Sequence, residues 1–334
     1  MTTSATVLSG YLSRFPNTAT KTLAILAYKE NKALWSNLEA CRTAIRRLRG
    51  ANGSKALSKL KNQEFVREKG ASGDPFGKLP EPLREFNEEW GTVIIPAPAK
   101  CLVLSDVHIP FYDKQALITA LNYGIHRGAD TVVLMGDIAD CFAVSFWEKD
   151  PRKRDFPGEI KAVREFLGVV RNLFKKARIV FKFGNHEDRY ERYMKVKAPE
   201  LLGVEAFELG SLLQLDNFGM IEVKENRPIR LGKLNMIHGH EYQFAISNPV
   251  NPARGLFLRG KAHSLCGHFH QSSQHSEKTL EQKVLSTWSL GALCDLHPSY
   301  RPINNWSHGF AFAEVDKEGV FSVQNLRIVN GVAY

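Results

Sequence analysis

Paired cysteines, long apolar runs and a charged leader followed by an apolar core do not occur in this sequence. The first residues, "MTTSATVLSGYLSRF", are mixed in character, and no apolar run approaches the roughly 20 residues that cross a bilayer, so we expect neither export nor a membrane partner. The cysteines are odd in number, widely spaced and never in a C-x-x-C pair: Cys41, Cys101, Cys141, Cys266 and Cys294. This pattern argues against a disulfide framework or a zinc–thiolate site, and it predicts reduced, mostly buried thiols in a cytoplasmic protein.

What the chain does contain is an ordinary globular composition, with 43% hydrophobic and 24% charged residues among 334. At roughly 150 residues per domain, this length predicts two domains. The formal net charge is +10, and it is unevenly distributed. Residues 1–70 hold thirteen Lys or Arg against four Asp or Glu, a balance of +9, which leaves +1 for the other 264 residues. The basic character therefore belongs to the first part of the chain.

The basic segment predicts two short helices joined by a tight turn. The stretch "TKTLAILAYKE" predicts a helix over residues 20–30, with Leu23, Leu26 and Ala27 on one side. A second helix is indicated by Ser36 and Glu39 in capping-box spacing, and Gly50 predicts its end. We assign residues 1–55 to a small all-α basic region.

Four arginines of the second helix are candidate nucleic-acid-binding residues. Three of them, at positions 42, 46 and 49, would share one solvent-facing stripe. The helix pair resembles a helix-turn-helix, whose second helix often meets DNA, but a solvated basic hairpin or an oligomer contact fits the pattern equally well. Residues 56–97 are rich in Gly, Ser, Lys, Glu and Pro, which predicts a linker with one or two short helices. The four candidates are Arg42, Arg46, Arg47 and Arg49.

From residue 98 to residue 334, strand and helix patterns alternate. The apolar strands in "KCLVLSDVH", "DTVVLMGD" and "ARIVFKFGNHE" are separated by helix-period stretches, which predicts right-handed crossovers and a mainly parallel sheet. Further strands end in "IHGH" and "GHFH". Because ligands gather beyond the carboxyl ends of strands in such sheets, we expect the polar residues that follow these strands to meet at one edge.

These strand ends carry D-x-H, G-D, G-N-H-E, H-G-H and G-H-x-H, in that order. Each motif alone is common, but the ordered set is not expected by chance. Carboxylate, amide and imidazole groups suit divalent Mn, Fe or Zn. Two such ions about 3.5 to 4 Å apart can bind a phosphate and hold an activated hydroxide in line for attack on phosphorus. The candidate ligands are Asp106, His108, Asp137, Asn185, His238, His268 and His270.

In "SDVH", "GDIAD", "GNHE", "IHGH" and "GHFH" the sequence resembles the calcineurin-like metallophosphoesterases, over about Lys100 to Val329. The resemblance implies an α/β fold, a sandwich of two mixed sheets flanked by helices, and two divalent metal ions. Manganese is the expected metal, with Fe, Zn, Ni and Mg as alternatives. The resemblance implies that one ion is bound by Asp106, His108, Asp137 and His270. It implies that the other is bound by Asp137, Asn185, His238 and His268, with Asp137 bridging.

Three further residues beside these motifs are candidates for catalysis. His186 follows a predicted ligand directly and is expected to act as the general acid that assists the leaving oxygen. Asp140 would orient His186 or a ligand imidazole, although a structural role in the turn fits as well. Arg189 would either clamp a phosphate or pair with one of three neighbouring acids. Those acids are Glu187, Asp188 and Glu191.

Charged residues near the last two motifs are candidates for supporting contacts. We expect His240 to support a ligand or to contact substrate. Arg254 and Arg259 precede "GHFH" and would face substrate anions, or would remain solvated.

The sequence therefore predicts a dinuclear-metal-dependent phosphoesterase. The basic region favours nucleic acid as the substrate, for a nuclease or a phosphatase of strand ends, because Lys and Arg give sequence-independent affinity for phosphates. One alternative is a phosphatase or phosphodiesterase of small molecules or phosphoproteins. A second is a DNA-binding adaptor without catalytic activity.

Overall fold

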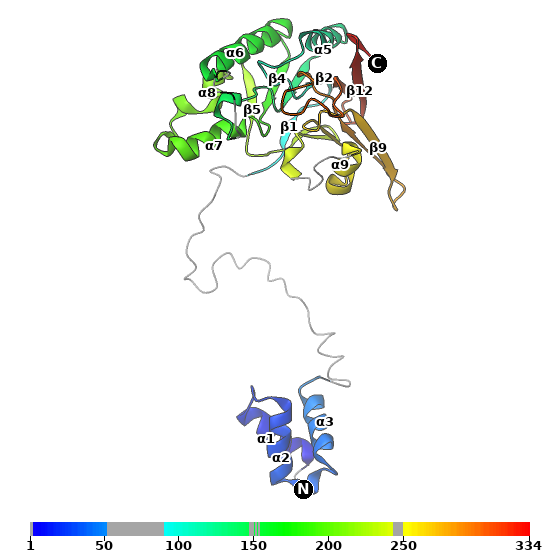
Figure 1. The fold of residues 1–334 in the computed structure, drawn as a ribbon. Coiled ribbons are helices and arrows are strands. Elements are labelled where there is room, and N and C mark those ends of the chain that lie inside the picture. Colours follow the sequence, from blue (N-terminus) through cyan, green and yellow to red (C-terminus); the bar gives the residue numbers. More distant parts are fainter. Residues whose placement is uncertain (1–2, 52–89, 147–149, 151, 153, 243–249) are drawn as a thin grey trace. The chain divides into compact units, whose positions relative to one another are not determined.

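The chain forms two units, Met1–Glu85 and Phe86–Tyr334 (Figure 1). The computed structural model describes residues 3–51, 90–146, 150, 152, 154–242 and 250–334. None of the helices in these residues is long and apolar enough to cross a bilayer. All five cysteines are buried and free, as the sequence predicted.

The first unit contains three helices packed around a small apolar core. Two of them match the predicted pair, and the third precedes them. Its buried Leu8 completes the core, which otherwise comes from the later helices. The helices are α1 (Ser4–Arg14), α2 (Thr20–Glu30) and α3 (Leu38–Leu48), with a 3-10 turn, η1 (Lys32–Leu34), between the last two.

Two details of this unit differ from the prediction. Leu26 is 37% exposed and Ala24 is fully buried instead, because α2 packs against both α1 and α3. The cap of α3 is Asn37 rather than Ser36, since the Asn37 side chain accepts the N–H of Ala40 at 2.8 Å. The predicted capping box is therefore wrong, and Glu39 instead forms an ion pair with Arg42 at 3.3 Å.

Arg49 does not belong to an exposed stripe. Its guanidinium donates to the Thr20 hydroxyl at 2.9 Å and to the carbonyls of Thr18 at 2.5 Å and Pro16 at 3.3 Å. It thus ties the end of α3 to the turn between α1 and α2. The connection between α2 and α3 spans residues 31–37, longer than the three- or four-residue turn of a helix-turn-helix.

Replacing Arg49 by alanine is expected to loosen the three-helix unit by about 1–2 kcal/mol, since several hydrogen bonds to a charged group are lost. Hydrogen exchange of the α1–α3 amides in the full-length protein measures this change. Arg47→Ala serves as the control because Arg47 is exposed and lies on the same helix. Equal protection in the two variants would contradict the tethering role.

The second unit is built on a seven-stranded sheet of order β13-β12-β11-β2-β3-β4-β5. Strands β2 to β5 run parallel, and β11 and β12 complete the sheet in antiparallel fashion. The strands are β2 (Ala99–Leu104), β3 (Thr131–Met135), β4 (Arg178–Lys182), β5 (Met220–Val223), β11 (Gly309–Val315), β12 (Phe321–Val329) and β13 (Val332–Ala333). The helices between these strands are α5 (Lys114–His126), α6 (Phe156–Leu173), α7 (Asp188–Lys197) and α8 (Leu209–Leu213), with 3-10 turns η2 (Phe142–Val144), η4 (Pro199–Leu201) and η5 (Glu205–Phe207).

A second sheet of six strands has the order β1-β6-β7-β8-β10-β9. Helix α9 packs against β8, β9 and β10 of this sheet. Strand β1 lies inside the segment predicted as linker, so the sheet begins before residue 98; residues 56–89 of that segment lie outside the described residues. The elements are β1 (Val93–Ile95), β6 (Ile229–Leu231), β7 (Leu234–Ile237), β8 (Ser264–Cys266), β9 (Ser273–Lys278), β10 (Val284–Ser289), α9 (Pro252–Gly260) and the turn η6 (His240–Tyr242).

The two-residue period of the strands divides the interior into two cores. In β2, Val103 faces the core shared by the two sheets, which also contains Met236 and Leu265 of the six-stranded sheet. Leu102 and Leu104 point the other way, into the core formed with α5 and α6. The predicted sandwich of two mixed sheets flanked by helices is confirmed.

Candidate metal centre

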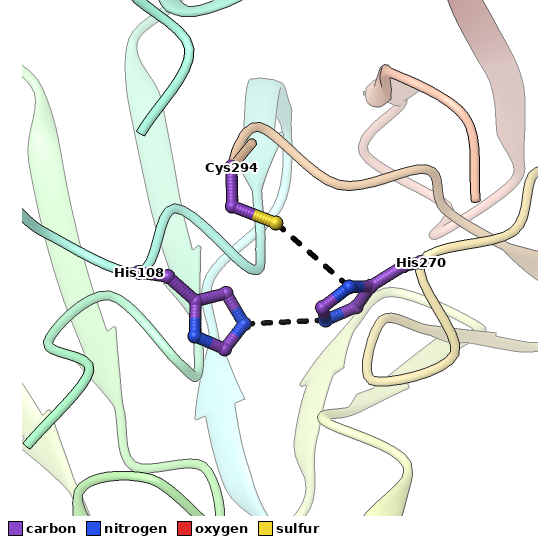
Figure 2. A group of neighbouring side chains, drawn as sticks. All are labelled: His108, His270 and Cys294. Atoms are coloured by element: carbon purple, nitrogen blue, oxygen red, sulfur yellow. Dashed lines mark hydrogen bonds between the residues drawn. The ribbon is translucent and has the colours of Figure 1, made fainter. Parts of the chain in front are cut away.

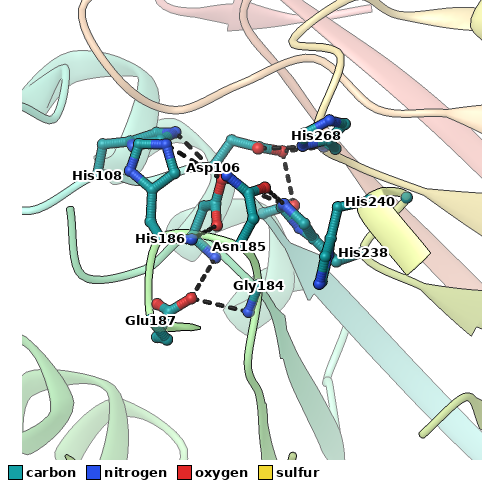
Figure 3. Close-up of polar contacts among 12 residues, drawn as sticks. Asp106, His108, Gly184, Asn185, His186, Glu187, His238, His240 and His268 are labelled. Atoms are coloured by element: carbon teal, nitrogen blue, oxygen red, sulfur yellow. Dashed lines mark hydrogen bonds and ion pairs between the residues drawn. The ribbon is translucent and has the colours of Figure 1, made fainter. Parts of the chain in front are cut away.

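The predicted metal ligands come together at one edge of the sandwich, in loops that follow β2, β3, β4, β7 and β8 (Figure 3). The first three strands are parallel neighbours in one sheet, and β7 and β8 are parallel neighbours in the other. Their carboxyl ends therefore deliver side chains from both sheets to the same place. Asp106, Asp137 and His238 are at most 1% exposed, so this place is shielded from water.

Five of the seven predicted ligands have left-handed backbone conformations. Such positive φ angles cost about 1–2 kcal/mol for each non-glycine residue, and strained residues often cluster at functional sites. Here they turn the chain sharply as it leaves each strand, so that the side chains point inward. The residues and their φ angles are Asp106 (55°), His108 (52°), Asp137 (53°), His268 (68°) and His270 (57°).

Two glycines allow the loops to approach one another closely. Gly136 has a φ of +90°, and a side chain there would place a Cβ 2.5 Å from Nδ1 of His238. At Gly184 a Cβ would lie 2.7 Å from the backbone nitrogen of Asp137. The G-D and G-N-H-E motifs thus require glycine because a predicted metal ligand occupies the space of the missing side chain.

Asp137 lies at the centre of the cluster. Its Oδ2 is 3.1 Å from Nε2 of His238 and 3.9 Å from Nε2 of His108. Within the described residues, Asp137 shares one group of donor atoms with His108 and His186 and another with His238 and His268; in each group the donors lie within 4.8 Å of one another. One carboxylate therefore faces two sets of metal-capable side chains.

The remaining predicted ligands extend these two sets. Asp106 Oδ1 is 3.2 Å from Nε2 of His270, and Nε2 of His270 is 3.2 Å from Nε2 of His108. On the other side of Asp137, Oδ1 of Asn185 is 3.2 Å from Nε2 of His238. The seven predicted ligands are thus brought together around Asp137, and their division into two sets stays a prediction.

Three of the imidazoles present Nε2 inward while another group holds Nδ1. His108 Nδ1 lies 2.9 Å from Oδ2 of Asp140, and His238 Nδ1 lies 2.9 Å from the carbonyl oxygen of Met135. His270 Nδ1 lies 3.8 Å from Sγ of Cys294 (Figure 2). Outer partners of this kind fix the ring orientation and tautomer of a metal ligand. Sequence reasoning missed Cys294, because nothing in its surroundings along the chain points to His270.

His186, Asp140 and Arg189 form a connected group beside the cluster. His186 Nδ1 lies 3.2 Å from Oδ2 of Asp140, and Arg189 donates to Nε2 of His186 at 2.6 Å. Arg189 also donates to the Asp140 carbonyl oxygen at 3.0 Å. Its partner is thus Asp140 rather than any of the three acids predicted from the sequence.

Electrostatics favour a neutral His186 in this arrangement. Burial lowers the pKa of His186, although the charge of Asp137 opposes the shift. An N–H donated by Arg189 requires a lone pair on Nε2, so the ring hydrogen sits on Nδ1 and points to Asp140. The pKa of Asp140 is lowered as well: burial alone would raise it, but His186 and His108 hold it well below the usual range. The aspartate is therefore ionised.

Glu187, the fourth residue of the "GNHE" motif, joins two ligand loops. Its carboxylate accepts backbone N–H groups from Asp137 at 2.9 Å, Ile138 at 2.8 Å, Ala139 at 2.9 Å and Gly184 at 2.8 Å. Burial, followed by the charge of Asp137, raises the pKa of Glu187 to about 7, while the N–H donors favour the ionised form. The sequence suggested only a surface ion pair for this residue.

A buried ion pair supports the loop that carries His238. Lys182 is 0% exposed, and its Nζ lies 2.9 Å from Oε1 of Glu241. The Glu241 carboxylate accepts the backbone N–H of His238 at 2.9 Å and that of Gly239 at 2.6 Å. Burial alone would raise the pKa of Glu241, but Lys182 lowers it to about 2. No local sequence pattern predicted this ion pair.

The residues predicted to give supporting contacts are placed differently from one another. His240 lies beside the cluster, with its ring 5.3 Å from that of His238 and Nε2 3.3 Å from Oδ2 of Asp188. Arg254 and Arg259 are exposed on α9, which packs on the six-stranded sheet. A contact of these two arginines, or of His240, with substrate stays a prediction.

The donor set fits two divalent metal ions. Buried carboxylate, amide and imidazole groups converge from five loops, and hard oxygen donors combined with imidazole suit first-row divalent ions. Burial would raise the pKa of Asp137, but the charges of His186 and His238 keep it well below the usual range, so its carboxylate is ready to bind a cation.

Comparison with known proteins adds the family. The family model for calcineurin-like phosphoesterases matches residues 99–291, which include all seven predicted ligands. The gene 54 protein of Mycobacterium phage L5 is 29% identical over 235 residues, covering 66% of this chain and 91% of the phage protein. The corresponding protein of Mycobacterium phage D29 is 26% identical over 229 residues, covering 65% and 89%.

Among solved structures, vacuolar protein sorting 29 from Cryptosporidium parvum is similar with a TM-score of 0.38 and 12% identity, covering 74% of this chain and 96% of that protein. The family model spans more than half of the chain and contains every motif that delivers a predicted ligand. The chain therefore belongs to the calcineurin-like phosphoesterase family and is a metal-dependent hydrolase.

Proposed function

We propose that the second unit hydrolyses phosphoesters with two divalent metal ions, and we expect the metal to be manganese. The position of Asp137 carries this proposal, since one buried carboxylate faces two groups of metal-capable donors. Asp106, His108, Asp137 and His270 would hold one ion, and Asp137, Asn185, His238 and His268 the other. Bound ions would polarise the phosphate and acidify a water molecule.

The group formed by His186, Asp140 and Arg189 acts on the leaving oxygen. To serve as a general acid, His186 must carry a proton on Nε2, and the Asp140 carboxylate 3.2 Å from Nδ1 stabilises the resulting imidazolium. Arg189 donates to that same Nε2 in the structure, so it must turn its N–H groups to the phosphate when the proton is present. His186 and Arg189 thus exchange partners when substrate binds.

Nucleic acid is the substrate class that we infer. Its support is the basic first unit, in which Arg42, Arg46 and Arg47 keep partly or fully exposed side chains while Arg49 is engaged in tethering. Exposed guanidinium groups bind phosphates through counterion release, without regard to sequence. The first unit would hold the chain on a polyanion while the second unit cleaves.

The test compares substrates with manganese-loaded protein: p-nitrophenyl phosphate, bis-p-nitrophenyl phosphate, and labelled single- and double-stranded DNA. We expect hydrolysis of the diester and of at least one DNA. Activity on p-nitrophenyl phosphate alone would support a phosphatase and exclude a nuclease. An absence of turnover with every divalent metal would favour the adaptor.

A triple substitution to glutamate is expected to weaken DNA retention and to flatten its salt dependence. The positions replaced are Arg42, Arg46 and Arg47. If each contacts one phosphate, the slope of log affinity against log salt falls by about 3. Filter binding across a salt series measures the slope. A variant with the same charge change in exposed lysines of the second unit, Lys114, Lys175 and Lys176, is the control. Equal slopes in the two variants would refute binding by the first unit.

A further inference from the structure

A loop formed by residues 294–307 lies directly against the predicted metal ligand His270. The loop begins at Cys294, whose Sγ is 3.8 Å from Nδ1 of His270, and it ends at Ser307, whose N–H donates to the His270 carbonyl oxygen at 2.8 Å. Between them, the ring of Trp306 lies 4.1 Å from that of His270. The loop therefore forms a wall of the centre on this side.

The loop is held in one conformation by its own hydrogen bonds. The Asn304 side-chain amide donates to the carbonyls of Leu296 at 2.6 Å and Arg301 at 2.8 Å, and its oxygen accepts the N–H of Trp306 at 2.8 Å. Nε2 of His308 lies 3.0 Å from the Cys294 carbonyl oxygen. Because these contacts fix the loop, side chains on it are presented at little further cost in conformational entropy.

This braced loop presents an exposed aromatic residue beside the predicted metal centre. Tyr300 is 73% exposed, and its ring is 6.5 Å from that of Trp306 at an angle of 66°. Trp306 in turn packs against His270, so the two rings lead from the exposed side of the loop to the predicted metal ligands.

We propose that Tyr300 and Trp306 form a stacking platform for one base of a nucleic-acid substrate bound at the centre. An exposed tyrosine ring and a half-buried tryptophan ring on a braced loop suit a flat, apolar group, and every nucleobase offers a π face for stacking. The proposal rests on the proposed function and narrows its substrates to phosphoesters that carry a base at this position.

The experiment uses dinucleotides that lack the base on one side of the diester, on the other side, or on neither. For the parent protein we expect kcat/KM to fall about 10-fold when one of the two bases is missing and to change little when the other is missing, because one base stacks on the platform. Tyr300→Ala should remove this difference by lowering kcat/KM for the dinucleotides that carry the stacked base. Tyr300→Phe should keep it, because the ring remains.

Tyr334→Ala provides the matched control, since Tyr334 is 69% exposed and its backbone pairs with that of Arg327 in the seven-stranded sheet. The same dinucleotides are also titrated into metal-loaded His186→Ala protein, so that stacking is measured without turnover. Equal affinity for all three dinucleotides there, or an equal loss of activity on all three in Tyr300→Ala, would overturn the platform. A different result would count against the proposed function instead. In that case the parent protein would hydrolyse none of the substrates with any metal, while the preference for the base in binding would remain.

Discussion

Replacing Asp137 by alanine is expected to abolish phosphoester hydrolysis, lowering kcat/KM by at least about a thousandfold, because metal ions contribute several kcal/mol to the stabilisation of the transition state. Among the residues that the structure describes, Asp137 is the carboxylate shared by both groups of donors, so its loss is expected to affect both ions together. We expect the purified variant to contain almost no metal after loading and desalting, as measured by elemental analysis.

His186→Ala is the matched comparison for this variant. His186 is also buried and lies 3.7 Å from Asp137, but its assigned role is to handle a proton rather than to hold a metal. We expect this protein to keep its metals while turnover falls by about 10²–10⁴-fold, the usual contribution of general acid catalysis. An equal loss of metal from both variants would reject the division of roles.

Replacing Lys182 by methionine is expected to lower the free energy of unfolding by about 3–5 kcal/mol, since it leaves a buried carboxylate without its counter-ion. Glu241 would then draw in water or a proton, and the backbone N–H groups of His238 and Gly239 that it accepts would shift. Chemical denaturation measures the stability, and metal content per chain measures the effect on the centre. We expect about one metal ion to remain, bound by the set that does not contain His238.

A double variant, Lys182→Met with Glu241→Leu, separates charge from positioning. Removing both charges should restore part of the stability, because an apolar pair of similar volume avoids the desolvation of two ions. The second metal should stay absent, because the N–H groups of His238 and Gly239 still lack their acceptor. If the double variant regained full metal content, the ion pair would contribute to stability but not to the positioning of His238 for metal binding.

The spacing of motifs along the chain was enough to predict that these side chains meet. Each predicted ligand follows an apolar strand, and the rule that parallel strands end at one edge brings Asp106, Asp137 and Asn185 together without knowledge of any contact. His238 and His268 follow two further apolar strands and were expected at the same edge, although these strands belong to the other sheet. The fold class was predictable for the same reason, since strand and helix periods differ clearly in this part of the sequence.

Partners that are distant along the chain could not be predicted. Lys182 and Glu241 belong to separate elements, and neither residue alone signals that the other will neutralise it in the interior. Arg49 looked like a solvent-facing residue of α3, yet its long side chain reaches the turn before α2 and binds carbonyl groups there. Arg189 similarly bypasses the acids beside it in sequence. Such choices depend on how elements pack, which local patterns do not encode.

The left-handed backbone of the predicted ligand residues is a strain that other contacts must offset. A glycine at His108 or His268 would adopt the same φ without the strain that a Cβ causes. At His108, however, the relief of about 1–2 kcal/mol would be outweighed, because the buried imidazole and its contact with Asp140 at 2.9 Å would be lost. The side chains that converge at these turns therefore stabilise the backbone that presents them.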